Sequence, residues 1–310
     1  MTAFGAINSL KLKLKMRIDW RLLFGRGYLS WHRRPKKLED WRKLPVVSSK
    51  ADYSDVAIVM QGVVDRKDEF TFETLRIYQY FFPGAILILS TWSDTDSRML
   101  DRARSLGVQV VVSEPIINAA TGNFLRQAET SIQGIHVAKS SGAKFVLKVR
   151  TDQRLYSHLS LDGLLSLVML FPPISSDRSL RGRIIFPSSN SFVDRILGAT
   201  DFMQFGYLED VQKMWTSSLR FDFTKDTTPE QTLTASYLLE LGWEREGLFT
   251  SDTWIRAMRE VFGFVDAASM DFFWHKYSMR EYLWRMYGSA PLDEITQSYW
   301  LKIMADGKSL

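Results

Sequence analysis

A carboxylate flanked by two arginines ends the hydrophobic segment KFVLKVRTDQRLY at residues 144–156. Strand-forming residues lead directly to Arg150, Asp152 and Arg154. An Asp at the exposed end of a strand can hold Mg²⁺ or Mn²⁺ against a diphosphate, and arginine forks bind phosphate oxygens through paired hydrogen bonds. The same spacing also suits an Asp that caps the strand and pairs with a neighbouring arginine. The spacing alone leaves both interpretations open.

The elements before this segment predict where Asp152 lies. Four short apolar runs are typical of buried strands: residues 56–62, 85–92, 108–115 and 144–149. Helical patterns separate them: residues 69–82, 96–107 and 123–142. Strands that alternate with helices form a parallel sheet with helices on both faces. Because ligands of such sheets bind beyond the carboxyl ends of the strands, we expect Asp152 at a ligand site.

The second half of the chain is less regular but continues the α/β pattern. It predicts a helix, a strand, a strand or turn that leads into a helix, and a final helix: residues 159–171, 183–190, 201–215 and 228–243. The final helix has clear end signals, with Thr228 as N-cap, Pro229 at the first position and Gly242 at the stop. The predicted fold class is therefore α/β.

Composition excludes several kinds of chemistry. The 310 residues contain no cysteine, which excludes disulfides, thiolate metal sites and a cysteine nucleophile. No run approaches the roughly 18 apolar residues that cross a bilayer. The first residues place apolar side chains before basic ones, the reverse of the order in a secretory signal. These features predict a protein that stays in the cytoplasm, where it is made.

Positive charge is concentrated at the N-terminus. Residues 1–50 hold 13 Lys and Arg against three acidic residues, a net charge of +10, while the rest of the chain is net −5. Trp and Leu interleave with these basic residues, as in segments that bind anionic membrane surfaces. A solvated helix packed on its own domain and a nucleic-acid-binding arm are the alternatives, and the acidic body argues against nucleic acid. We expect a peripheral protein on the inner face of the cytoplasmic membrane, without a nucleic-acid partner.

Longer motifs resemble a known fold and a known family. Residues 123–153 resemble the nucleotide-sugar half of GT-A glycosyltransferases, in which a helix leads into a strand with an acidic, metal-binding end. The blocks GATDFMQFGYLEDVQKMW and PEQTLTASYLLELGW resemble the acceptor half. The segments VAIVMQG, FTFETLRIYQYFFPGAILILSTW and VLKVRTDQRLY are similar to the WavE-type lipopolysaccharide-synthesis family over roughly residues 56–275. STW and RTDQR are the most distinctive pieces.

The resemblance implies a GT-A-like, mostly parallel sheet flanked by helices, with a basic N-terminal arm. The arm would be residues 1–50 and the GT-A-like domain residues 51–310, with a nucleotide-sugar half at 51–158 and an acceptor half at 159–310. The implied ligands are a nucleotide-sugar donor, a lipid-linked or lipopolysaccharide glycan acceptor, and Mn²⁺ or Mg²⁺ as cofactor. The chain departs from the fold's two-acid metal motif, because Arg150 takes the place of the first acid.

The resemblance also implies roles for individual residues. Asp152 would hold the metal or the diphosphate, and Arg150 or Arg154 would help to neutralise the leaving nucleotide. His275 would be a late metal ligand or a phosphate contact. Donor-binding roles fall on strand ends and on the start of a helix: Gln61, Gly62, Trp92, Asp94, Asn123, Arg126 and Gln127. The structural alternatives are an ordinary strand-terminal turn, a core tryptophan, a solvated helix start and a structural histidine.

An inverting transfer also needs a base to accept a proton from the acceptor hydroxyl. Glu230 is the first candidate because it opens a helix of the acceptor half, where it can equally serve as a helix-dipole partner. Asp201 is the second candidate. The predicted function is transfer of a sugar from a nucleotide-sugar to a lipopolysaccharide core or capsular glycan. The alternatives are a sugar-phosphate transferase and a non-catalytic GT-A-like assembly protein, which the substitution at Arg150 favours.

Overall fold

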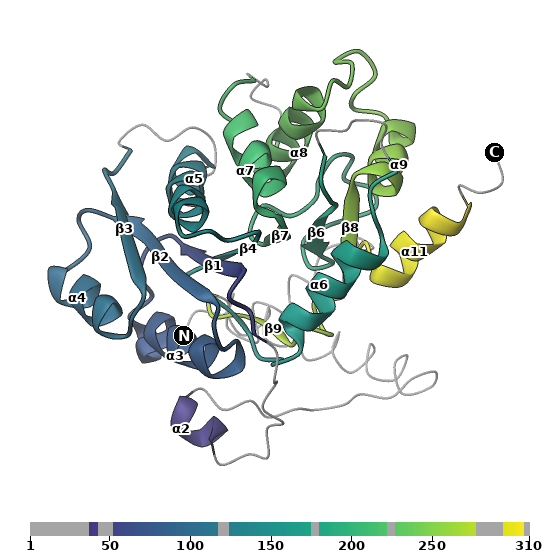
Figure 1. Cartoon of the computed structure of the whole chain (residues 1–310). Helices are drawn as coiled ribbons and strands as arrows, with labels where there is room; N and C mark the ends of the chain where they lie inside the picture. Colours follow the sequence, from purple (N-terminus) through teal and green to yellow (C-terminus); the bar gives the residue numbers. More distant parts are fainter. Residues whose placement is uncertain are drawn as a thin grey trace, which may run out of the picture. The chain divides into compact units, whose positions relative to one another are not determined.

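A seven-stranded sheet forms the centre of the part of the chain that the structure describes (Figure 1). The structure is a computed structural model and describes residues 37–42, 52–116, 124–174, 180–221, 227–276 and 294–306. These residues belong to one compact unit, residues 36–310. The strands follow the order β3 (Gln109–Ser113), β2 (Ile86–Trp92), β1 (Val56–Gln61), β4 (Phe145–Arg150), β7 (Gln204–Tyr207), β6 (Ile184–Pro187) and β8 (Phe262–Val265).

The sheet is mostly parallel. Strands β1 to β4 pair in parallel, as do β6 and β8, whereas β7 runs antiparallel to both of its neighbours. Every residue of β1 is buried, as expected for a strand covered on both faces. The predicted α/β fold with a mostly parallel sheet is confirmed.

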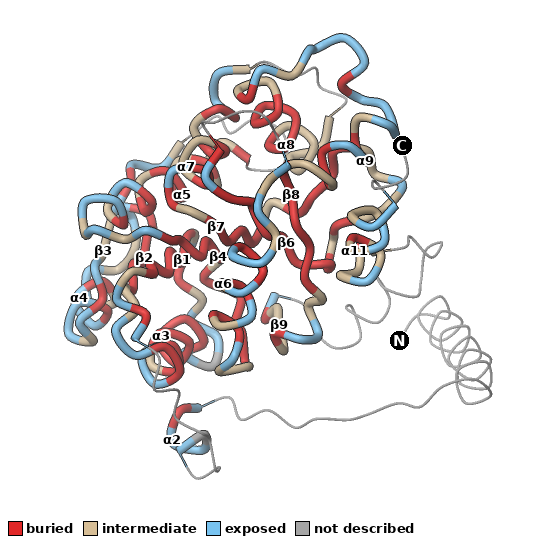
Figure 2. The backbone as a smooth tube through the Cα atoms, turned by 45° about the vertical axis from the view of Figure 1, so that its right-hand side comes forward, coloured by how far each residue is buried: buried red, intermediate tan, exposed pale blue. Residues whose placement is uncertain are grey.

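Helices cover both faces of the sheet (Figures 1 and 2). On one face, α5 (Phe124–Ser140) packs on β1, β2 and β3, and α7 (Leu208–Ser217) contacts both α5 and α8 (Pro229–Glu240). On the other face lie α3 (Phe70–Phe81), which follows the short helix η1 (Lys67–Glu69), and α6 (Ser160–Leu170). The edges of the sheet are flanked by α4 (Ser97–Ser105) at β3 and by α9 (Ser251–Glu260) and α11 (Gln297–Asp306) at β8.

The predicted helices and strands of both halves are confirmed to within a few residues. The start of α8 illustrates why local signals suffice there. Thr228 Oγ1 accepts a hydrogen bond from the Gln231 amide at 3.3 Å, and Gln231 Oε1 accepts one from the Thr228 amide at 3.1 Å. This reciprocal capping box satisfies donors that a helix start otherwise leaves unpaired.

The strand order places a topological switch between β1 and β4. From β1 the chain moves outward through β2 and β3, then returns to β4 on the other side of β1. The segments that leave β1 and β4 lie side by side at the carboxyl ends of these strands, the edge at which ligands of open α/β sheets bind. Gln61 pairs with Arg150 in the last register position of the two strands. The segment around Asp152 follows at this switch.

A small second sheet brings the C-terminal part of the chain to this switch. β5 (Gln153–Leu155) pairs antiparallel with β9 (Phe272–Trp274), a strand that the sequence did not predict. Gln153 pairs with Trp274, and the His275 amide donates to the Asp152 carbonyl at 2.9 Å. Side chains more than 100 residues apart thus meet at the end of β4.

Only a small part of the expected N-terminal arm belongs to the described residues. There, α2 (Leu38–Trp41) contacts α3: Leu38 is buried and its amide donates to Glu73 Oε2 at 3.0 Å. Glu39 pairs with Arg76. The rest of residues 1–50 lies outside the described part. Among the described helices, none has the length and apolar character that a membrane crossing requires.

A glycine sets how closely α5 approaches the sheet. A Cβ atom at Gly134 would clash with Val59 Cγ1 and lie 3.1 Å from Ser90 Cβ. Gly163 in α6 is also a helical glycine, but it has free space around it: a Cβ atom there would meet no atom within 4 Å. The two positions separate the cost of close packing from the general cost of glycine in a helix.

We predict opposite effects of alanine at these two glycines. Gly134→Ala should lower the free energy of unfolding by about 1–3 kcal/mol through overpacking, whereas Gly163→Ala should raise it by about 0.5–1 kcal/mol by restricting the unfolded chain. Urea unfolding followed by circular dichroism measures both. A Gly134→Ala protein as stable as the parent would mean that α5 does not need this close approach.

Candidate functional site

Arg150, Asp152 and Trp274 form a tight cluster at the end of β4. Arg150 Nε and Nη2 donate to Asp152 Oδ1 and Oδ2 at 2.9 and 3.0 Å. Trp274 Nε1 also donates to Oδ2 at 3.0 Å, and the Arg150 guanidinium lies 5.3 Å from the Trp274 ring centroid. The Arg150 and Asp152 side chains are 29 % and 15 % exposed. The cluster is therefore preorganised and partly exposed.

These contacts set the charge state of Asp152. Burial of the carboxyl tends to raise its pKa, but the hydrogen bond and charge of Arg150, together with the Trp274 hydrogen bond, outweigh burial. The pKa of Asp152 consequently lies below its ordinary value. Asp152 is thus an anion held by a cation, and Arg150 is a cation whose orientation is set by Asp152 and Trp274.

The end of β1 brings the backbone close to this cluster. Gly62 adopts φ +117°, and a Cβ atom there would lie 3.3 Å from Thr151 Oγ1. The Gln61 side chain is buried and its Oε1 accepts from Thr130 Oγ1 of α5 at 2.8 Å. The Gln61 carbonyl accepts from the Thr151 amide at 3.0 Å. Gln61 thus holds the switch together, while Gly62 lets the chain turn beside it.

Lys148 is a functional candidate that the sequence prediction missed. It is fully buried in β4, and its Nζ donates to the Asp201 carbonyl at 2.7 Å and lies 4.3 Å from the Trp215 ring centroid. Gln127 Nε2 donates to the same carbonyl at 2.7 Å. Burial lowers the pKa of Lys148 well below its ordinary value, against the influence of Asp201. The available signal was a lysine in the middle of an otherwise apolar strand.

Asp201 lies among charges of both signs. Asp201 is half-buried and lies on the loop before β7. Burial and the nearby Glu230 carboxylate raise the pKa of Asp201, whereas Lys148 and Arg150 act in the opposite direction. A raised pKa makes the carboxylate a better proton acceptor than an ordinary aspartate, which fits Asp201 as the second candidate base.

Glu230 is anchored in the first turn of α8. Its Oε1 accepts from Asn190 Nδ2 at 2.8 Å and lies 3.4 Å from Arg195 Nη1. In the described part of the chain, Oε2 makes no hydrogen bond. The side chain is 13 % exposed. Asn190 and Arg195, which the sequence prediction did not include, therefore orient Glu230 and leave one oxygen for another partner.

Arg154 lies in the core, away from the exposed edge of the cluster. It is 1 % exposed, and its guanidinium donates to Thr74 Oγ1 at 2.8 Å, Tyr156 OH at 2.8 Å and the Phe70 carbonyl at 3.1 Å. The same group stacks on the Phe70 ring at 4.3 Å. Odd and even positions of a strand face opposite sides, but the turn at residues 151–152 ends that alternation. Arg150 and Arg154 consequently have different surroundings.

The residues expected to hold a metal are bonded to other groups. Both Asp152 oxygens accept hydrogen bonds from Arg150 and Trp274, and His275 Nδ1 lies 2.6 Å from Asp65 Oδ2. The His275 ring also stacks on Phe70, with centroids 4.3 Å apart. The described residues contain no group of three or more His, Asp or Glu that could hold a metal ion. This arrangement does not fit a resident Mn²⁺ or Mg²⁺ with Asp152 and His275 as ligands.

The other predicted donor residues are spread along the same edge. Trp92 is 7 % exposed at the end of β2, and Asp94 is exposed two residues later. Arg126 near the start of α5 is half-buried, and its Nε donates to the Ile116 carbonyl at 2.8 Å. Asn123 lies outside the described residues. The structure thus gathers Gln61, Gly62, Gln127, Arg150, Asp152, Asp201 and Glu230 around one sheet edge.

The sequence model of one protein family, described as WavE lipopolysaccharide synthesis, matches residues 56–274. The chain belongs to this family. The match spans β1 to β9, so the WavE segment includes both the switch region and the Glu230 region. Family membership links this WavE protein to lipopolysaccharide synthesis. No curated protein sequence matches the chain.

Several solved structures are distantly similar to this WavE chain. A 4-diphosphocytidyl-2C-methyl-D-erythritol synthase from Anaerococcus prevotii is 9 % identical, with a TM-score of 0.42 and coverage of 83 % of this chain and 100 % of that one. Glucosyl-3-phosphoglycerate synthase from Mycobacterium tuberculosis, solved with Mn²⁺, UDP-glucose and glycerol 3-phosphate, is 10 % identical, with a TM-score of 0.32 and coverage of 70 % and 89 %. A mannosyltransferase from Pyrobaculum calidifontis with GDP-mannose and Mn²⁺ is 9 % identical, with a TM-score of 0.32 and coverage of 98 % and 97 %. Similarity of this size carries neither a ligand nor an activity over to this chain.

Proposed function

We propose that this WavE protein is a glycosyltransferase that moves a sugar from a nucleotide-sugar donor to a lipopolysaccharide core or capsular glycan. The observation that carries the proposal is the Arg150–Asp152–Trp274 cluster at the switch between β1 and β4. An oriented, partly exposed guanidinium at this place suits the diphosphate of a nucleotide-sugar. Membership of a lipopolysaccharide-synthesis family supports a glycan as the acceptor.

The donor would lie along the carboxyl edge of the sheet. Gly62 would let the backbone approach the nucleotide, and Trp92 with Asp94 would face its base and ribose. The start of α5, at Arg126 and Gln127, would favour the phosphates through the positive end of the helix dipole. Asn123, which lies outside the described residues, keeps its predicted donor-binding role.

Arg150 would supply the charge that the leaving diphosphate needs. In the transfer, the acceptor oxygen forms a bond to the anomeric carbon while the bond from that carbon to the diphosphate oxygen breaks. Arg150 would stabilise the negative charge that gathers on the diphosphate. Mn²⁺ or Mg²⁺, if it enters with the donor, would add Lewis-acid stabilisation, but the geometry of Asp152 and His275 supports no metal-dependent step. Arg154 is assigned a structural role.

Glu230 would accept the proton of the acceptor hydroxyl. Asn190 and Arg195 hold Oε1, and Oε2 is the oxygen that would meet the acceptor. Asp201 lies on the loop between β6 and β7, where both Glu230 and Arg150 influence its charge, and it would bind acceptor hydroxyls. Lys148 would act as a positioning residue, because it holds the Asp201 carbonyl.

We predict that Arg150 and Arg154 can be separated experimentally. Arg150→Gln should weaken nucleoside diphosphate binding by about 10- to 100-fold, the size of a lost charged hydrogen bond. Arg154→Met should leave that affinity unchanged but lower the free energy of unfolding by about 2–4 kcal/mol, because three buried acceptors lose their donor. Calorimetry with UDP, GDP, CDP and ADP, with either Mn²⁺ or EDTA, measures affinity, and urea unfolding measures stability.

The same titration separates the proposal from its rivals. Binding that is equal in EDTA and Mn²⁺, and lost in Arg150→Gln, supports Arg150 as the main phosphate contact. Binding that requires Mn²⁺ and disappears in Asp152→Asn would restore the metal site. Nucleotide binding without hydrolysis or transfer would favour the non-catalytic alternative, and a phosphodiester in the product, visible by ³¹P NMR, would favour the sugar-phosphate transferase.

We predict that Glu230→Gln lowers turnover by about 10²- to 10⁴-fold while donor affinity stays the same, because the amide cannot accept a proton. Glu209→Gln is the matched control, since Glu209 also lies in the first turn of a helix, α7, and is exposed.

The pH dependence of turnover distinguishes Asp201 from Glu230 as the base. The Glu230 carboxylate raises the pKa of Asp201, so its removal lowers that pKa. Near-normal turnover in Glu230→Gln, with the acidic limb of the pH profile moved to lower pH, would assign the base to Asp201.

The proposal includes attachment of residues 1–50 to an anionic membrane. Their net charge of +10 is expected to contribute roughly 1 kcal/mol per basic residue near the surface. A chain that lacks residues 1–45 should therefore fail to sediment with vesicles that contain phosphatidylglycerol, whereas the full chain should sediment with them. If the two chains sediment equally, residues 1–45 do not carry the membrane contact.

A further inference from the structure

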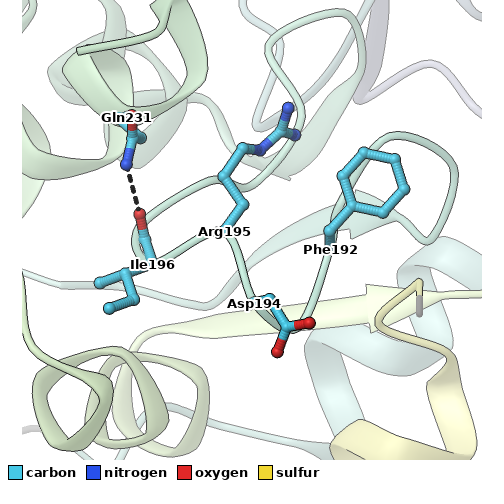
Figure 3. A pocket seen from close by; sticks show the side chains of 5 residues that line it. All are labelled: Phe192, Asp194, Arg195, Ile196 and Gln231. Atoms are coloured by element: carbon cyan, nitrogen blue, oxygen red, sulfur yellow. Dashed lines mark hydrogen bonds between the residues drawn. The ribbon is translucent and has the colours of Figure 1, made fainter. Parts of the chain in front are cut away.

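A pocket of about 370 Å³ lies on the loop between β6 and β7 (Figure 3), and one of its lining residues, Arg195, lies 3.4 Å from Glu230. Four residues of this loop line it together with Gln231 of α8: Phe192, Asp194, Arg195 and Ile196. Its volume lies near the lower end of the range of about 300–1,000 Å³ for small-molecule sites. The pocket is thus suited to a small ligand and lies next to the residue assigned as base.

The loop that forms the pocket is held firmly. Arg195 folds back and donates through Nε and Nη2 to the Gly198 carbonyl at 3.2 and 2.9 Å, and Nη2 also donates to the Asn190 carbonyl. A Cβ atom at Gly198 would clash with the Arg195 side chain. Gln231 Nε2 donates to the Ile196 carbonyl at 3.0 Å, as Figure 3 shows. A wall of this kind is preorganised and loses little entropy on binding.

The backbone of the loop is left-handed at one residue on each side of the pocket segment. Asn190 has φ +62° and Leu197 has φ +55°, and Leu197 is fully buried. A positive φ is rare for a bulky residue and is retained where the surroundings impose it. The hydrogen bonds of Arg195 and Gln231 hold the loop in this conformation, which sets the positions of Phe192 and Asp194.

Charge decides which small ligand suits the pocket. The Arg195 guanidinium is compensated by Glu230 at 3.4 Å and lies 5.0 Å from the Phe192 ring centroid. The pocket therefore offers no uncompensated cation to a phosphate. Asp194 is exposed and, as a carboxylate, only accepts hydrogen bonds. Phe192 and Ile196 supply apolar surface. A matching ligand is neutral, has an apolar face and donates hydrogen bonds.

We propose that this pocket binds a pyranose ring of the acceptor glycan. The C–H face of the ring would lie on Phe192, and neighbouring hydroxyl groups would donate to Asp194. Arg195 lines the pocket and lies 3.4 Å from Glu230 Oε1, so a ring bound there would lie on the side of the residue assigned as base. The assignment of this ring to the acceptor rests on the proposed transferase function, whereas sugar binding by itself does not.

Saturation-transfer NMR tests the sugar site directly. The probes are the methyl pyranosides of glucose, galactose, mannose and heptose, each titrated into the full-length protein. Phe192→Ala should weaken binding of the preferred pyranoside at least about fivefold, from the loss of an aromatic contact, and Asp194→Asn should also weaken it. Phe249→Ala is the matched control, because Phe249 is an exposed phenylalanine that does not line the pocket. Thermal unfolding of each variant shows whether it is folded.

Nucleotide titrations of the same variants assign the ring to donor or acceptor. Unchanged affinities of Phe192→Ala for the nucleoside diphosphate that the parent binds, and for the corresponding nucleotide-sugar, support an acceptor site. A loss of nucleotide-sugar affinity without loss of nucleoside diphosphate affinity would overturn that assignment, because the pocket would hold the donor's sugar. No saturation transfer from any pyranoside, or equal transfer in parent, Phe192→Ala and Asp194→Asn, would overturn the sugar site. Pyranoside binding in a protein that binds no nucleoside diphosphate would retain the sugar site and reject the proposed transferase.

Discussion

The parallel pairing of β1 with β4 is the constraint on which the candidate site depends. Its last register position sets Gln61 opposite Arg150, so the two strands end side by side and lead into two different loops at the same level of the sheet. The Thr130 hydrogen bond to Gln61 ties α5 to this point, and the Gln127 hydrogen bond to the Asp201 carbonyl ties α5 to the next loop. One helix and two strand ends therefore position residues that the sequence separates widely. A shift of the register by one residue would turn Arg150 to the other face of the sheet.

Charge compensation is the second feature of the site. Asp152 faces Arg150, Glu230 faces Arg195, and Asp201 lies near both Lys148 and Arg150. Buried or half-buried charges are stable only when partners of opposite sign accompany them. An anionic ligand at this edge meets cations that are already oriented, so little reorganisation is needed when charge develops on it. The same compensation explains why Asp152 is poorly placed to serve as an open metal ligand.

Local signals made much of the fold predictable. Apolar runs of strand length, glycine stops and the Thr228–Pro229 helix start each depend on neighbours in the chain, and the corresponding elements occur where they were expected. The position of Asp152 at a strand end followed from the same pattern. β9 was not predicted, because three aromatic residues form a strand only when β5 is available to pair with them. Lys148 was missed for a related reason: a lysine is compatible with a strand by propensity, and only Trp215 and the Asp201 carbonyl show that it is buried.

The sequence by itself determined the fold class, the family and the residue types at the carboxyl edge of the sheet, because periodicity and short motifs are local properties. The tertiary structure decided which of those residues act together. Arg150 and Arg154 are four residues apart and chemically identical, yet one is oriented by Asp152 and Trp274 at an open edge and the other is buried among Phe70, Thr74 and Tyr156. Asp152 and His275 were expected to share a metal, yet each has a different partner. The reason is physical: hydrogen bonds and burial depend on groups that folding brings together from distant parts of the chain, and no local pattern contains them.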